Sequence, residues 1–228
     1  YYPTQFMAAL LTSVIDFPGK VASYILTCRD MHINILPPDI NSGQTGFSVS
    51  DGQIIYALTA IKGIGRSVID LITAERERNG KFRDLADFID RTVAGSREIN
   101  KRTIENLIKA GAFDSFGATR KQMMSVYLQL TDELTQSHKN RLSGQMSIFD
   151  LMQDDPGMTA AGKVQYPDVG EYPKELMLEF EKDVLGLYVS GHPLEEYAGL
   201  LRSVANVSAA DFALDEEIGT AKLPDGKA

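Results

Sequence analysis

Residues 58–69 read LTAIKGIGRSVI, and this stretch decides how the middle of the chain is expected to fold. A short helix is predicted to end at Lys62-Gly63-Ile64-Gly65, and a longer helix is predicted to begin at about Arg66. Glycine at the first position permits backbone angles that residues with side chains resist, and glycine at the second lets another backbone approach closely. The sequence therefore predicts two helices joined by a tight turn.

The start of the second helix has the properties of an anion-binding site. The amides of residues 65–67 lack partners inside the helix, and the helix dipole favours a phosphate there. Lys62 and Arg66 add mobile positive charge beside the turn, while Ile61 and Ile64 can anchor it against the helices beneath. A helix–turn–helix corner with no ligand is the alternative interpretation of a Gly-x-Gly pair. The candidate phosphate-binding residues are Lys62, Gly63, Ile64, Gly65, Arg66 and Ser67.

A weaker version of this arrangement follows in the chain. The helix expected around residues 100–110 meets Gly111-Ala112-Phe113, and another helix is expected to begin near Thr119. Arg120 and Lys121 lie in its first turn, where positive charge opposes the helix dipole, so we expect them to partner an anion. Together the two turns resemble a helix–hairpin–helix pair, a module that holds the DNA backbone without reading bases. Whether the second turn contacts DNA or only shapes the fold is left open.

The distribution of charge favours a polyanionic partner, although the total charge does not. The chain of 228 residues carries a formal net charge of −8. Residues 61–121 contain 13 Lys and Arg against 9 Asp and Glu, whereas the rest of the chain contains 10 against 22. A basic block inside an acidic chain points to that block as the place of nucleic-acid contact.

Composition and cysteine usage limit the class of protein. A hydrophobic content of 43% and a charged content of 24% are typical of a globular protein. The single cysteine, Cys28, cannot form an internal disulfide, which favours a reducing intracellular setting. No apolar run approaches the roughly 20 residues that cross a bilayer, so no membrane partner is expected. Both ends of the chain look like cuts through a longer protein.

Hydrophobic spacing predicts a mainly α-helical fold of short helices around a tandem helix–hairpin–helix core. Apolar side chains recur at helical spacing in several segments, with Phe6 and Leu128 among those expected to point inward. Residues 47–56 differ, because apolar residues alternate on both sides of Asp51-Gly52. That pattern predicts one small β-hairpin with a type I′ turn.

The sequence contains no recognisable catalytic or metal-binding pattern. The three histidines are isolated, and there is no Cys/His cluster, no P-loop and no Asp-x-Asp pair. Asp84, Asp87 and Asp90 are expected to lie on a solvated helix face. We therefore expect neither catalytic nor metal-binding residues in this chain.

A second candidate site lies at Gln145, Met146, Ser147, Ile148 and Phe149. These residues resemble the Gln-x-x-Leu/Ile-Phe pentapeptide by which bacterial replication proteins attach to the ring-shaped sliding clamp. In that mode an aliphatic and an aromatic side chain enter apolar pockets, while the Gln amide forms hydrogen bonds at the rim. Burial of the two side chains could contribute about 1.5–3 kcal/mol each, so binding by the motif alone should be modest. The alternative is a helix end that packs the apolar pair into the core.

Five segments in order resemble the α subunit of bacterial DNA polymerase III, the C-family replicase. They are YYPTQFMAALLTS at the front, LPPDIN at 36–41, ALTAIKGIG at 57–65, INKRTIENLIKAGAFDSFG at 99–117 and EFEKDVLGLYVSGHPLEEY at 179–197. The resemblance implies four regions. They are the end of a fingers domain at 1–35, a helix–hairpin–helix (clamp-binding) domain at 36–142, a loop with the clamp motif at 143–170, and a helical linker toward an OB domain at 171–228.

The resemblance also implies a role in DNA replication, in the bacterial cytoplasm. The chain would bind duplex DNA non-specifically, tether the polymerase to the sliding clamp, and meet other replicase subunits through the parent protein. The parent would be a Mg²⁺-dependent DNA-directed DNA polymerase, a nucleotidyltransferase whose catalytic aspartates lie upstream of residue 1. This chain is therefore expected to hold no cofactor and to be inactive alone. A helix–hairpin–helix scaffold of a DNA-repair protein is the alternative.

Overall fold

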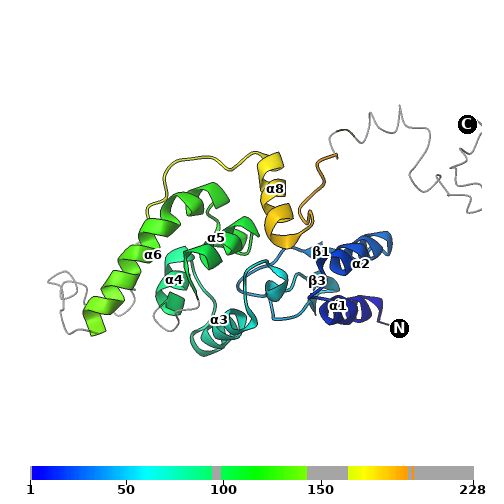
Figure 1. Ribbon diagram of the computed structural model, residues 1–228, viewed down its shortest axis with the longest axis horizontal. Helices are drawn as coiled ribbons and strands as arrows, with labels where there is room; N and C mark the ends of the chain where they lie inside the picture. Colours follow the sequence, from blue (N-terminus) through cyan, green and yellow to red (C-terminus); the bar gives the residue numbers. More distant parts are fainter. Residues whose placement is uncertain (1, 94–98, 143–163, 195–196, 198–228) are drawn as a thin grey trace, which may run out of the picture. The chain divides into compact units, whose positions relative to one another are not determined.

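The computed structural model describes residues 2–93, 99–142, 164–194 and 197, and these residues are mainly helical (Figure 1). The described helices are α1 (Pro3–Ser13), α2 (Pro18–Asp30), α3 (Arg66–Asn79), α4 (Leu85–Val93), α5 (Lys101–Lys109), α6 (Arg120–Leu142) and α8 (Lys174–Leu185). Two short 3₁₀ turns are η1 (Leu58–Ala60) and η2 (Asp114–Phe116). The predicted mainly α-helical class is therefore confirmed. No helix in the described ranges is both long and apolar enough to cross a membrane.

The chain divides into two units by its contacts. Residues up to Ser190 form one compact unit, and Gly191 begins a second one. Within the second unit, the Leu194 amide donates to Nδ1 of His192 at 3.1 Å. The four regions drawn from the polymerase resemblance remain predictions.

A small sheet contains the predicted hairpin. Strands β2 (Ser48–Ser50) and β3 (Gln53–Ile55) are antiparallel, and Asp51 and Gly52 between them have φ angles of 51° and 76°. Positive φ at both positions is what a type I′ turn requires, so the hairpin prediction is confirmed. The sequence did not reveal a third strand, β1 (Ile35–Leu36), which pairs in parallel with β3. Two residues are too few to show an alternating pattern.

The two N-terminal helices pack against each other, and α1 also contacts β2 and β3. The buried face of α1 is made by Met7, Ala8 and Leu11. Phe6, which was predicted to point inward, is 65% exposed, so that expectation is wrong. It lies beside the buried stripe rather than on it, since adjacent helix positions are about 100° apart.

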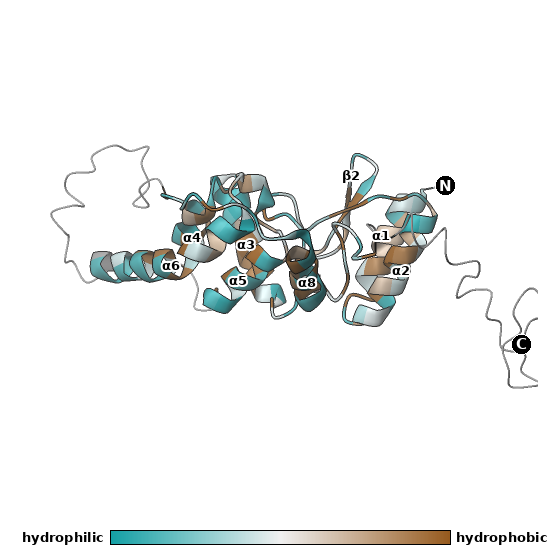
Figure 2. Cartoon of the chain, turned by 90° about the horizontal axis from the view of Figure 1, so that it is seen from above, coloured by the Kyte–Doolittle hydropathy of each residue, from teal (hydrophilic) through white to brown (hydrophobic). Residues whose placement is uncertain are grey.

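Helices α3 to α6 pack in pairs, α3 on α4, and both α4 and α5 on the long helix α6. Met123 and Tyr127 are buried on α6, whereas Leu128 is 48% exposed, contrary to expectation. Figure 2 shows that α6 becomes almost entirely hydrophilic toward its C-terminal end. The first half of α6 therefore carries most of its contribution to the core.

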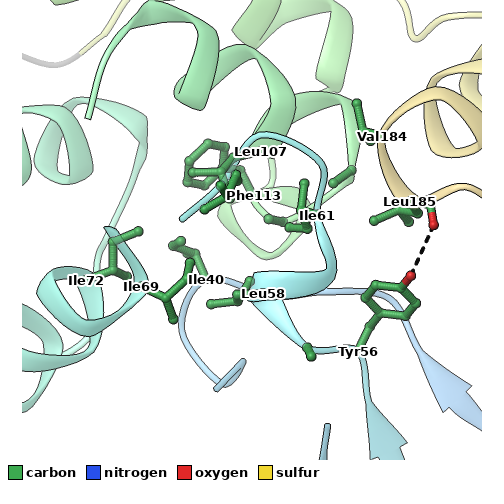
Figure 3. Packing of buried hydrophobic residues seen from close by; sticks show 14 of the residues in the cluster. Ile40, Tyr56, Leu58, Ile61, Ile69, Ile72, Leu107, Phe113, Val184 and Leu185 are labelled. Atoms are coloured by element: carbon green, nitrogen blue, oxygen red, sulfur yellow. Dashed lines mark hydrogen bonds between the residues drawn. The ribbon is translucent and has the colours of Figure 1, made fainter. Parts of the chain in front are cut away.

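Helix α8 packs on α5 and completes a continuous core (Figure 3). Ile61, just after η1, lies between Leu107 of α5 and Val184 of α8. The Tyr56 hydroxyl donates to the Leu185 carbonyl at 3.3 Å. Burial raises the pKa of Tyr56, so this hydroxyl stays protonated and remains a donor. The segment before the Gly-x-Gly turn is thus held between two helices.

A buried ion network lies where a solvated face was expected. Asp87 is only 3% exposed, and its carboxylate contacts Arg91 at 3.1 Å and Arg83 at 3.2 Å. Arg91 also reaches Glu75 at 2.9 Å and lies over the Phe82 ring. Asp84 accepts from the Asp87 amide at 2.8 Å and so helps to cap α4. The prediction of a solvated acidic face is therefore wrong for Asp87, because Arg83 and Arg91 lie close enough to let its carboxylate be buried.

Replacement of Asp87 by Ala should cost about 2–3 kcal/mol of unfolding free energy. It leaves Arg91 partly buried with Glu75 as its one charged partner among the described residues, and breaking a buried pair is strongly destabilising. Chemical denaturation of the 228-residue chain measures this cost. Glu77→Ala on the exposed surface of α3 is the control and should change stability by no more than about 0.5 kcal/mol. Equal, small effects for both variants would show that the network adds nothing to stability.

Candidate nucleic-acid interface

The Gly-x-Gly turn has the geometry that its sequence predicts. Gly63 has a φ of +78°, in the left-handed region where residues with side chains are strained. Gly65 has a φ of −77° and is the N-cap of α3, which begins at Arg66 as expected. Ile61 and Ile64 are 1% and 6% exposed and fix the turn in the core. This segment, residues 61–65, is called the hairpin below, and it is distinct from the β-hairpin of β2 and β3.

The N-terminus of α3 is open. No side chain caps it at Gly65, and within the described ranges the amides of Arg66 and Ser67 have no hydrogen-bond acceptor. A Cβ atom added at Gly65 would meet only the Ser67 hydroxyl, at 3.8 Å. The position of a side chain at Gly65 is therefore open, residues 65–67 are exposed, and the amides remain available to an external acceptor.

Two distant elements hold the hairpin in place. The Asn106 side chain of α5 donates to the Lys62 carbonyl at 2.8 Å. The Lys62 amide donates to the Val184 carbonyl of α8, also at 2.8 Å. Sequence reasoning missed Asn106 and Val184, because neither is close to the hairpin in the chain and neither belongs to a local pattern. Together they fix both sides of the Lys62 peptide backbone.

The cationic side chains beside the turn differ in their surroundings. Lys62 Nζ lies 3.8 Å from an Asp183 carboxylate oxygen, and the two side chains are 71% and 62% exposed. Arg66 is exposed, and no carboxylate of the described residues forms an ion pair with it. The structure therefore brings Lys62, Arg66 and the open amides to one end of α3.

The second turn is occupied by the chain itself. Gly111 has a φ of +78°, like Gly63, but Arg120 is buried against it at 5% exposure. The Arg120 guanidinium contacts Asp114 at 2.8 Å and lies 3.5 Å from Glu181. Burial alone would lower the pKa of Arg120, but the hydrogen bond and charge of Asp114, with Glu181, raise it overall. The expectation that Arg120 is available to an external anion is wrong.

The N-terminus of α6 is also filled. Thr119 and Gln122 form a capping box, with side-chain to amide distances of 3.2 Å and 3.0 Å. Glu171 accepts from the Arg120 amide at 2.8 Å and from the Lys121 amide at 3.1 Å. The anion at this helix start is therefore a carboxylate of the same chain. Of the two turns, only the first leaves its helix amides free.

Two further expectations concern the clamp-binding motif and metal ligands. The candidate clamp-binding residues, Gln145 to Phe149, lie outside the described residues and remain a prediction. Among the described residues, no group of three or more His, Cys, Asp or Glu side chains could hold a metal ion.

A family model for the helix-hairpin-helix motif matches residues 32–123. That range contains the Gly-x-Gly turn, the second turn at Gly111 and the small sheet. The helix–hairpin–helix prediction is therefore confirmed at the level of the motif.

The chain is also similar to part of a longer bacterial protein. DNA polymerase III subunit alpha of Vibrio cholerae is 40% identical over 198 residues, covering 86% of this chain and 17% of that protein. The protein of the same name from Deinococcus radiodurans is 39% identical over 212 residues, covering 92% and 15%. The one from Escherichia coli K12 is 36% identical over 198 residues, covering 86% and 17%. The chain spans about one sixth of the length of these relatives, and its resemblance to this polymerase subunit is confirmed over that segment.

The two glycines of the hairpin should respond differently to the same substitution. Gly63→Ser should cost about 1–2 kcal/mol of unfolding free energy, because φ is positive and a Cβ would lie 3.1 Å from Asn106 Nδ2. Gly65→Ser should be neutral or stabilising by about a few tenths of a kcal/mol, since serine is a slightly better N-cap than glycine and the backbone at this position is extended. Denaturant titrations compare the two variants, and an equally large loss at Gly65 would contradict the open geometry of that position.

Proposed function

We propose that this chain, similar to a segment of the α subunit of bacterial DNA polymerase III, binds the backbone of duplex DNA through its hairpin and the N-terminus of α3. The observation that carries the proposal is the open N-terminus of α3, where the Arg66 and Ser67 amides have no acceptor among the described residues. Lys62 and Arg66 lie beside these amides and supply positive charge. A phosphodiester oxygen is the acceptor that this arrangement fits best.

The contact would be independent of base sequence. Backbone amides and flexible cations bind phosphate oxygens but do not reach the base edges that distinguish one sequence from another. Binding should therefore depend steeply on salt, because counterions leave the duplex when phosphates are contacted. The net charge of −8 opposes binding of the isolated chain, so its affinity should be weaker than that of a basic domain.

The contrast between the two turns supports the choice of the first one. Both contain a glycine with positive φ before a helix, but Glu171 and Arg120 fill the second. A DNA phosphate at α6 would have to displace Glu171 and lie close to the Asp114 carboxylate. At α3 it would displace only water from the amides.

The role in DNA synthesis is proposed from the relatives. Each of those named above is a DNA polymerase III subunit alpha, which favours a replicative polymerase over a repair scaffold. Template-directed synthesis, Mg²⁺ and contact with other replicase subunits would then belong to the whole protein, in the bacterial cytoplasm. This segment would bind the duplex and help to hold the polymerase on DNA.

A second contact, with the sliding clamp, is proposed for the pentapeptide Gln145 to Phe149. Its support is the residue pattern, with a glutamine followed by Ile148 and Phe149 at the spacing of the clamp-binding peptide. In the chain it lies between α6 and α8. Attachment to DNA and to a ring around the same duplex would raise the effective concentration of each contact.

Two variants test the DNA contact in the 228-residue chain. Lys62→Glu should weaken binding to a fluorescent duplex by about fivefold or more at low salt, and should reduce the slope of log affinity against log salt by about one. Gly65→Ser should also weaken binding, because its hydroxyl accepts from the amides that phosphate would use and its side chain fills the space before them. Fluorescence anisotropy at several salt concentrations measures both effects.

A matched charge reversal separates a local contact from a general charge effect. Lys81→Glu makes the same change beyond the other end of α3, where Lys81 is exposed. It should reduce affinity much less than Lys62→Glu. Equal effects of the two reversals, or binding that does not depend on salt, would contradict the proposed interface.

The clamp contact is tested by Ile148→Ala combined with Phe149→Ala. Loss of both apolar side chains should abolish retention of the chain by a bacterial sliding clamp in a pull-down, because these two groups provide most of the buried area. The melting temperature should stay nearly unchanged. Met146→Ala with Ser147→Ala, at the two variable positions of the pentapeptide, is the control and should retain binding. A large loss of stability in the first variant would instead place the apolar pair in the core.

A further inference from the structure

We infer that Asp183 sets the strength of the proposed DNA contact, as a carboxylate that competes with phosphate for Lys62. The inference rests on the proposed function and adds a residue of α8 to the interface. Its basis is the position of the Asp183 carboxylate, 3.8 Å from the Lys62 ammonium and largely exposed. Asp183 therefore faces the same cation that a DNA phosphate would need.

The backbone of α8 keeps Asp183 beside the hairpin. The next residue, Val184, accepts the Lys62 amide at 2.8 Å, and Leu185 accepts the Tyr56 hydroxyl at 3.3 Å. Val184 and Leu185 are 2% and 4% exposed, so this end of α8 is packed in the core. The Asp183 side chain can turn in solvent, but its Cα cannot leave the hairpin without breaking these contacts.

Asp183 has an unfavourable place within its own helix. It lies in the last turn of α8, before the C-cap Gly186, where the helix dipole favours positive and not negative charge. Lys182 in the same turn donates to the Gly186 carbonyl, as expected for a cation at this end. The carboxylate of Asp183 therefore finds its compensating charge outside the helix, on Lys62.

The ion pair between Lys62 and Asp183 is weak enough for a phosphate to replace the carboxylate. Both side chains are more than half exposed, and exposed ion pairs of this kind are weak and screened by salt. A phosphate that binds the α3 amides can replace Asp183 as the partner of Lys62. The Asp183 carboxylate then remains close to the phosphate, and the two negative charges repel each other. Asp183 should thus lower the affinity for DNA and raise the dissociation rate. Faster dissociation would let the chain exchange one phosphate for the next along the duplex.

The test is the affinity of the 228-residue chain for a fluorescent duplex after Asp183→Asn. We expect binding to tighten about two- to fivefold at low salt, with a smaller gain at high salt, because screening weakens both the pair and the repulsion. Glu77→Gln removes the same charge from the exposed surface of α3, eleven residues and about 16 Å along the helix from Arg66, and should have little effect. In a Lys62→Met background the gain from Asp183→Asn should shrink, since no cation is left to be released. Circular dichroism and melting temperature check that the variants fold alike.

The outcomes separate this inference from the proposed function. If Asp183→Asn changes affinity no more than Glu77→Gln while Lys62→Glu and Gly65→Ser still weaken binding, the inference fails and the DNA contact stands. If an equal gain persists in the Lys62→Met background, Asp183 does not act through Lys62, and the competition is excluded. If the Lys62 and Gly65 variants bind as the unmodified chain does, the proposed function fails, and the inference fails with it.

Discussion

The hydrogen bond from the Lys62 amide to the Val184 carbonyl is the interaction on which the proposed interface depends. It joins the turn before α3 to the end of α8, and Ile61 packs beside it between α5 and α8 (Figure 3). Asn106 secures the opposite side of the same peptide through the Lys62 carbonyl. A flexible Gly-x-Gly segment could not keep its helix amides oriented by itself, because glycine lowers the cost of other conformations. The orientation of the proposed phosphate site therefore depends on α5 and α8 as well as on the turn itself.

The two turns share a local pattern, but the helix N-terminus is filled by side chains after one turn and open after the other. Each has a glycine with φ of +78° and is followed by a helix with cations near its start. At α6 a capping box and Glu171 satisfy the first amides, and Arg120 is buried between acidic side chains. At α3 the corresponding amides face open space. One of the two similar turns therefore stabilises the fold with its own side chains, whereas the other leaves its helix amides at the proposed phosphate site.

Charge in this protein is organised by contacts between elements more than by runs in the sequence. Asp87 and Glu181 are almost completely buried, each near an arginine from the packed helices. Glu181 also accepts from the amides of Val189 and Ser190, at 2.9 Å and 3.0 Å, and so fixes the chain after α8. These buried ions stabilise the framework, whereas the exposed pair of Lys62 and Asp183 is free to exchange partners. Burial therefore separates structural charges from those that can serve binding.

The amino-acid sequence by itself determined the local features. Glycine spacing predicted the hairpin and the start of α3, Asp51-Gly52 predicted the type I′ turn, and helical spacing predicted the mainly α class. These features follow from backbone angles and periodicity within a few residues. Only the tertiary structure decided which helix start stays open, that Asn106 and Val184 hold the hairpin, and that Asp183 faces Lys62. Such contacts join residues far apart in the chain, and their partners are chosen by packing, for which no short segment carries a signal.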